Sequence, residues 1–163
     1  MNIRFTKTYR RLVRGTNINE TSLLATDYLN HFNEVVMLLE LIPDMPDMFE
    51  DVEAWQPASY AEHFAASVFS DKDLAIWAYE NAPKEYIEAF ETSIAAADQK
   101  ILDAVAEIKA LLETASDEEL RNTVLSLLTD IKAILDQISA IINGTLVRLD
   151  QQQIDVVFQR TDG

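Results

Sequence analysis

Residues 83–143 read PKEYIEAFETSIAAADQKILDAVAEIKALLETASDEELRNTVLSLLTDIKAILDQISAIIN, and this stretch decides the fold. Apolar residues recur in it at alternating steps of three and four, first from Ile87 to Leu111 and again from Leu120 to Ile141. Steps of this kind place the apolar side chains along one side of an α-helix that packs lengthwise on another helix. The sequence therefore predicts two long helices within residues 83–143.

The segment TASDEE at residues 114–119 separates the two periodic runs. Ser116 and Glu119 have the spacing of a capping box, which begins a helix by satisfying two backbone amides at its N-terminus. Two helices joined by so short a turn must lie antiparallel and side by side. Further apolar residues widen the stripe on both helices, so we expect other helices to pack on this pair. The predicted fold is all-α: a four- or five-helix bundle built on a long antiparallel helical hairpin (about 83–143), with a short basic N-terminal arm.

The composition supports a helical fold and one domain. The chain has 163 residues, of which 48% are hydrophobic, with only three glycines and four prolines. So few turn-forming residues argue against a fold of many short strands, and the length is typical of a single domain. The chain has no cysteine, which excludes disulfides, thiolate catalysis and cysteine-bound zinc and fits a reducing compartment.

Local signals divide residues 1–163 into six segments of a single helical domain. Apolar steps of three and four predict a helix at 20–42 that ends before Pro43, and a capping box at Ser59 and Glu62 begins the first of two short helices. The arm and the tail each fit a helix or a strand, and we favour a helix for the tail. The segments are a basic arm (1–19), a helix (20–42), an acidic connector with Pro and Met (43–58), two short helices (59–82), the helical hairpin (83–143) and a C-terminal tail (144–163).

Charge is distributed unevenly along the chain. The net charge is −15, yet residues 1–19 carry five basic and no acidic side chains, so the remaining 8 basic and 28 acidic residues sum to −20. An acidic body of this kind repels nucleic acid and anionic membranes, and we therefore expect no nucleic-acid partner. We expect the basic arm to pack against its own acidic body or against that of a neighbouring subunit.

The sequence shows no membrane span and no export signal. The longest apolar run, VVMLLELIP at residues 35–43, is far shorter than the roughly 20 residues that cross a bilayer. The N-terminus lacks the apolar core and small-residue cleavage site of a secretory signal. We therefore expect a cytoplasmic protein.

The two histidines are the main candidates for chemistry. Asp27, His31 and Glu34 project from one face of the predicted helix at 20–42, while Glu62 and His63 lie on the first short helix. Two imidazoles and several carboxylates suit Fe, Mn or Zn. The candidate metal ligands are therefore His31, His63, Asp27, Glu34 and Glu62.

The spacing around both histidines argues against a diiron site. Bundles of that class place a glutamate three residues before each histidine, whereas this chain has Tyr28 before His31 and Tyr60 before His63. The alternative is that both histidines lie at the edge of the apolar core, with His31 bonded to Asp27 and no metal bound. The spacing favours this structural interpretation.

The acidic connector at 43–58 is the second candidate site. Its acids lack the ligand order, central glycine and closing glutamate of a calcium-binding loop. Its apolar residues either pin the connector across the bundle or contact a protein partner, because exposed Met and Trp side chains form adaptable contacts. The candidate contact residues are Met45, Met48, Phe49 and Trp55.

Recognisable catalytic motifs are missing from the sequence. It contains neither Gly-x-Ser-x-Gly nor a glycine-rich phosphate loop, so we name no catalytic or cofactor-binding residue. Together with apolar stripes wider than one short chain covers, this predicts a non-enzymatic helical-bundle protein that acts through protein–protein interaction in a regulatory or scaffold role. We expect it to self-associate as a homo-oligomer. One alternative is a metal-binding bundle, an enzyme or a sensor, that uses His31 and His63 with nearby carboxylates; another is a small-molecule sensor with a cavity near Trp77.

Overall fold

The computed structural model describes residues 5–146, whose regular secondary structure is helical, with no β-strand apart from one isolated bridge between Ile18 and Ala25. The all-α prediction is confirmed. The predicted count of four or five helices is not confirmed, because this part of the chain forms seven α-helices, most of them short. In chain order they are α1 (Thr6–Leu12), α2 (Asn30–Leu41), α3 (Phe49–Ala54), α4 (Tyr60–Ala66), α5 (Lys72–Glu80), α6 (Lys84–Thr114) and α7 (Asp117–Ile142), with the 3-10 segments η1 (Thr26–Leu29) and η2 (Pro46–Met48).

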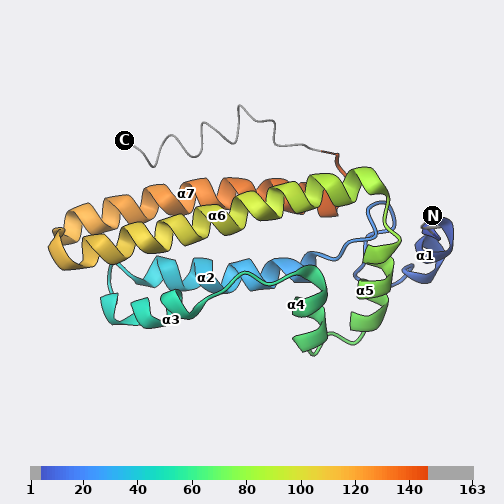
Figure 1. The fold of residues 1–163 in the computed structure, drawn as a ribbon, viewed down its shortest axis with the longest axis horizontal. Helices are drawn as coiled ribbons and strands as arrows, with labels where there is room; N and C mark the ends of the chain where they lie inside the picture. The colour runs from blue at the N-terminus through green and yellow to red at the C-terminus, as the bar shows by residue number, and fades with distance from the viewer. Residues whose placement is uncertain (1–4, 147–163) are drawn as a thin grey trace.

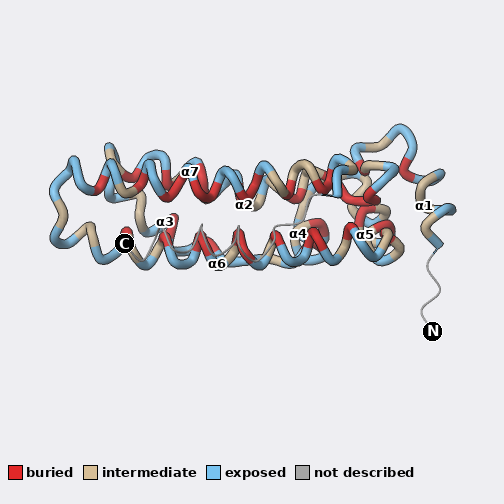
Figure 2. Tube along the Cα trace, turned by 90° about the horizontal axis from the view of Figure 1, so that it is seen from above, coloured by how far each residue is buried: buried red, intermediate tan, exposed pale blue. Residues whose placement is uncertain are grey.

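The two longest helices, α6 and α7, lie side by side along their length (Figure 1). At the start of α7, Ser116 accepts a hydrogen bond from the Glu119 amide at 3.2 Å, as the capping signal predicts. The apolar positions of both helices are buried between the elements, and the exposed positions lie on the outer sides (Figure 2). Burial of each large aliphatic side chain contributes about 1.5–3 kcal/mol, so this seam is the main source of stability.

The helix predicted at 20–42 begins later than expected, because residues 19–25 form a turn. The Asn19 side-chain oxygen accepts hydrogen bonds from the amides of Thr21 at 2.8 Å and Ser22 at 3.1 Å. The backbone of Leu23 adopts a positive φ of 60° in this turn. Asparagine and serine side chains that bond to nearby backbone compete with helix formation, and this local bonding overrides the apolar periodicity.

The turn at residues 19–25 is anchored to the far end of α7. The Ser22 hydroxyl donates a hydrogen bond to the Ile142 carbonyl at 2.5 Å, and the Tyr86 hydroxyl donates one to the Gly144 carbonyl at 2.6 Å. Gly144 has a φ of 99°, which is the left-handed conformation expected of the residue that follows a helix. From this anchor, α2 runs along α7, and α3 packs against α2 and α6 (Figure 1).

The helices α4 and α5 pack on each other, and α1 lies beyond α5 at the end of the molecule opposite to the α6–α7 turn (Figure 1). The Phe5 amide donates to the Asn81 side-chain oxygen at 3.0 Å, and the Thr6 hydroxyl donates to the Asn81 carbonyl at 2.7 Å. Residues 6–12 of the basic arm are therefore helical, and the arm contacts its own chain. Residues 147–163 of the predicted C-terminal tail lie outside the described residues.

A buried ion pair links the two long helices. Lys100 on α6 and Asp130 on α7 have their charged atoms 3.5 Å apart, and their side chains are 0% and 5% exposed.

Within residues 5–146, no helix combines the length and the apolar character that crossing a lipid bilayer requires.

Candidate functional site

The structure brings the two histidines together. His31 lies in the first turn of α2 and His63 lies on α4, and their ring centroids are 6.1 Å apart. The ring of Tyr28 is close to both, with centroids 6.3 Å from His31 and 5.5 Å from His63. We refer to Tyr28, His31, Trp55, Tyr60 and His63 as the histidine–aromatic cluster.

Each histidine has a different environment. His63 Nε2 lies 3.1 Å from the Asp27 carbonyl, and because a carbonyl only accepts, this nitrogen carries the hydrogen. His31 stacks on Trp55 with ring centroids 4.8 Å apart, and Trp55 Nε1 donates a hydrogen bond to the His31 carbonyl at 2.9 Å. His31 Nε2 is buried and has no hydrogen-bond partner within residues 5–146. Burial, followed by the nearby His63, lowers the pKa of His31 and holds the ring neutral.

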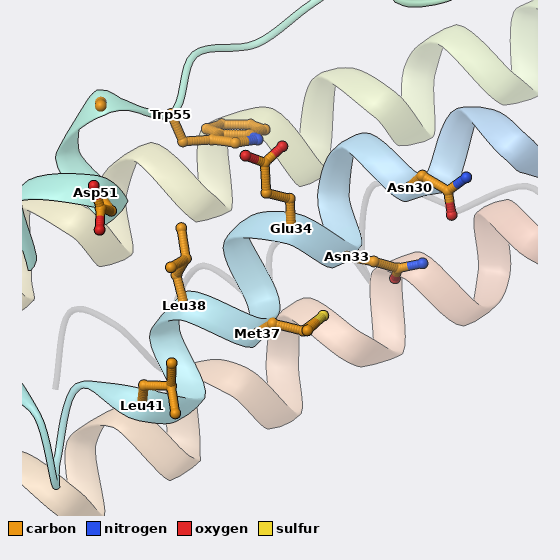
Figure 3. A pocket seen from close by; sticks show the side chains of 9 residues that line it. Asn30, Asn33, Glu34, Met37, Leu38, Leu41, Asp51 and Trp55 are labelled. Atoms are coloured by element: carbon orange, nitrogen blue, oxygen red, sulfur yellow. The ribbon is translucent and has the colours of Figure 1, made fainter. Parts of the chain in front are cut away.

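The three carboxylates predicted as metal ligands do not converge on the histidines. Asp27 Oδ2 is buried and has no hydrogen-bond partner in the described chain. Glu34 lies beside Trp55 on the groove between α2 and α3 (Figure 3). Glu62 accepts from the Ser59 amide at 3.3 Å in the predicted capping box, and its hydrogen bonds with Ser59 lower the pKa of Glu62.

The predicted five-ligand arrangement is therefore not formed. Among residues 5–146, no three His, Cys, Asp or Glu side chains group closely enough to hold a metal ion. The reason is local, because Glu62 caps α4 and the position of Glu34 on α2 directs its side chain to the groove. Sequence reasoning placed both histidines on suitable faces but could not show how these carboxylates were engaged.

The tyrosines of the histidine–aromatic cluster were not predicted as site residues. The Tyr28 hydroxyl donates to the Ala58 carbonyl at 2.6 Å, and the Tyr60 hydroxyl accepts from the Ala25 amide at 2.9 Å. Burial raises the pKa of both tyrosines, so both stay protonated. Each hydroxyl is bonded to backbone, so the cluster ties η1, α2 and α4 together.

A groove of about 660 Å³ lies between α2 and α3 (Figure 3). Met37 and Leu41 are 65% and 41% exposed although both are apolar, and they lie one helical turn apart on α2. The apolar lining consists of Met37, Leu38, Leu41, Ala54 and Trp55, and the polar lining consists of Asn30, Asn33, Glu34 and Asp51.

The groove is negatively charged. Glu34 and Asp51 are its only charged lining residues, and neither forms an ion pair with a lysine or arginine of residues 5–146. Other acids nearby are already paired with cations, in the pairs Glu40–Lys132, Asp44–Arg121 and Glu53–Lys109. The two lining carboxylates are therefore available to a cation on whatever occupies the groove.

Of the four contact residues predicted in the connector, only Trp55 lines this groove. Met48 and Phe49 pack partly buried against the core, and Met45 is 51% exposed outside the groove lining. Sequence reasoning missed Met37, Leu38 and Leu41. The available signal was that Met37 and Leu41 lie off the apolar seam of their helix. Trp77, proposed as a pocket residue, is 52% exposed on α5 and is not among the residues that line this groove.

A second groove of about 290 Å³ lies on the other side of α2, against α7. It is smaller, and Lys132 and Glu40 on its rim form an ion pair across it at 2.6 Å. We take the α2–α3 groove as the main candidate surface because it is larger and its charges have no internal partner.

Comparisons of the chain with protein-family models, with curated proteins and with solved structures found no match.

Proposed function

We propose that the protein catalyses no reaction and acts by binding another polypeptide in the α2–α3 groove, in a regulatory or scaffold role. The observation that carries this proposal is the pair of exposed apolar side chains, Met37 and Leu41, beside Trp55 in an acidic groove. Methionine adapts its shape to different partners, whereas Trp55 is only 7% exposed and forms a fixed, largely buried wall of the groove.

The exposure of the groove favours a polypeptide over a small molecule. A small ligand beside Met37, which is 65% exposed, would remain largely in water, whereas pockets for small ligands enclose most of their ligand. A helix laid along α2 would cover Met37 and Leu41 together, because side chains four residues apart lie on the same face. Each covered side chain would contribute about 1.5–3 kcal/mol at full burial.

Self-association and a cytoplasmic location are part of the proposal. A homo-oligomer would bury apolar surface that the single chain leaves exposed, and a second copy is therefore one possible occupant of the groove. The absence of cysteine fits a reducing compartment such as the cytoplasm.

Selection of peptides from a displayed library, followed by fluorescence of Trp55, tests the proposal. In a Trp77→Phe background, Trp55 is the only tryptophan, so its emission reports on the groove. We expect selected peptides to shift this emission and to lose binding to the Met37→Glu variant. Val68 is fully exposed at 103% between α4 and α5, so Val68→Glu is the matched control and should leave binding intact.

Two results would contradict the proposal. One is that no selected peptide changes the Trp55 emission. The other is that binding survives Met37→Glu while circular dichroism shows that the variant remains folded.

A metal-binding function is the second candidate, because two buried polar atoms, His31 Nε2 and Asp27 Oδ2, have no hydrogen-bond partner in residues 5–146. With zinc–nitrogen bonds of about 2 Å, a tetrahedral zinc would hold two imidazole centroids about 5 Å apart, close to the 6.1 Å between His31 and His63. Because His63 Nε2 donates to the Asp27 carbonyl, Nδ1 is the nitrogen with which His63 would bind Fe, Mn or Zn. Elemental analysis of protein purified without chelator tests this, with His31→Ala and His63→Ala as the matched pair. Stoichiometric metal that both substitutions remove would support the metal site over a purely structural role.

A further inference from the structure

The first helix exposes apolar and cationic side chains on two adjoining sides, with Phe5 and Leu12 on one side and Lys7 and Arg11 on the other. Phe5, which caps the N-terminus of α1, and Leu12, its last residue, are 57% and 54% exposed, and their spacing of seven residues places them near the same side of the helix. Residues 5–14 contain four basic side chains and no acidic one. Of these, Arg14 pairs with Glu20 at the surface, and Lys7 and Arg11 form no ion pair with any residue in the described chain.

The α2–α3 groove complements these side chains in chemistry and in length. It offers apolar Met37 and Leu41 together with the unpaired carboxylates of Glu34 and Asp51. The lining on α2 extends from residue 30 to residue 41, about 16 Å of helix, whereas Phe5 and Leu12 are about 10 Å apart along theirs. The exposed apolar side of α1 is therefore short enough to lie within the groove.

The helix α1 cannot reach the groove of its own chain. It is fixed beside α5 by the hydrogen bonds of Phe5 and Thr6 to Asn81, at the end of the molecule away from α3 (Figure 1). These bonds use backbone and hydroxyl groups, so the side chains of Phe5 and Leu12 remain exposed. Two complementary surfaces at separate places on one chain can meet only between molecules.

We propose that the occupant of the α2–α3 groove is α1 of a second copy of this chain, so that copies associate head to tail. This inference rests on the proposed function, because it names the polypeptide that the groove binds. Phe5 and Leu12 would cover Met37 and Leu41, while Lys7 and Arg11 would approach Glu34 and Asp51. A head-to-tail contact joins two different surfaces, so it builds a ring where the rotation closes and an open chain where it does not.

Two double variants separate this contact from every other mode of association. The groove variant carries Met37→Glu and Leu41→Glu, and the arm variant carries Arg11→Glu and Leu12→Glu. All four positions are exposed, so both variants should keep the fold, which circular dichroism verifies. Each variant alone should lower the association constant by about a hundredfold or more, since charge replaces the apolar contact. The control variant Val68→Glu with Leu102→Glu alters exposed apolar residues on other surfaces and should behave as the wild type.

Sedimentation velocity of an equimolar mixture is the decisive measurement. The groove variant retains an intact arm and the arm variant retains an intact groove, so the mixture should form a discrete dimer, while the wild type forms either a closed ring or open chains that grow with concentration. Added salt should weaken both assemblies, because it screens the exposed charges. A mixture that stays monomeric overturns the proposal, and so do variants that associate as the wild type does.

The outcomes also separate this inference from the proposed function. If the wild type is monomeric at every concentration but displayed peptides still bind in the groove, the second copy is excluded and another protein with a cationic amphipathic segment is the partner. If neither a second copy nor any peptide binds, both proposals are wrong.

Discussion

Replacing the buried ion pair between α6 and α7 tests how the long hairpin is held together. Lys100 Nζ and Asp130 Oδ2 are 3.5 Å apart, with side chains 0% and 5% exposed. At an effective dielectric constant of about 20, two unit charges at this distance attract by about 5 kcal/mol. Removing one partner leaves the other charge buried without this ion pair, so Lys100→Met and Asp130→Leu should each lower the free energy of unfolding by about 3–5 kcal/mol.

The double variant should recover most of this loss. With both charges removed, apolar side chains of similar length fill the same space, and the free energy of unfolding should return to within about 1 kcal/mol of the wild type or exceed it. Urea unfolding of the wild type, both single variants and the double variant, followed by circular dichroism, gives the coupling energy directly.

A surface pair provides the control for this cycle. Lys132 and Glu40 are 2.6 Å apart but their side chains are 52% and 45% exposed, so their coupling energy should not exceed about 1 kcal/mol. If the Lys100–Asp130 coupling is equally small, water reaches the pair and the reasoning from burial is refuted.

Four other substitutions test residues that the fold places in unusual environments. Burial raises the pKa of Asp98 from 3.8 to about 6. The unfolded chain therefore loses this proton more readily than the folded chain, and the free energy of unfolding falls as the pH rises through this range. In urea melts, Asp98→Asn should therefore be about 1 kcal/mol more stable at neutral pH and lose this advantage below pH about 4; equal stability at neutral pH would contradict this. Burial lowers the pKa of His31, so the unfolded chain binds that proton more readily and stability falls as the pH drops below about 6.5. His31→Phe should flatten this part of the pH profile of the unfolding free energy, and an unchanged slope would show that the ring is solvated. Gly144 has a φ of 99° and a Cβ there would lie 3.3 Å from a threonine side chain, so Gly144→Ala should cost about 1–2 kcal/mol. Gly15→Ala, with a φ of 81° but open space around it, should lower the melting temperature less, and equal losses would show that the close contact adds nothing.

Elements defined by local periodicity were predictable from the sequence. The two long helices follow from apolar residues repeated over many turns, and the start of α7 follows from Ser116. The start of α2 was not predictable in this way. The apolar pattern continues through residues 20–25, but the hydrogen bonds of Asn19 to the following amides hold these residues in a turn. Periodicity reports the average environment of a stretch, and one short side chain bonded to backbone can end a helix within it.

The candidate site, like the fold, was predictable only in part from the sequence. The sequence identified Trp55 and both histidines, but the distance of 6.1 Å between the histidine rings depends on how the connector folds back. The positions of Met37 and Leu41 off the seam of their helix were visible in the sequence, but their exposure was not, since an apolar residue off the seam is buried or exposed according to which neighbour packs there.

The sequence by itself determined which side of each long helix is apolar, because that depends only on positions along one helix. The tertiary structure decided which of those sides are covered. The hydrogen bonds of Ser22 to Ile142 and of Trp55 to His31 join residues far apart in the chain and set where α2 and α3 lie. The groove between them exists because α3 is short and covers only part of α2, and this depends on contacts between elements that no local pattern encodes.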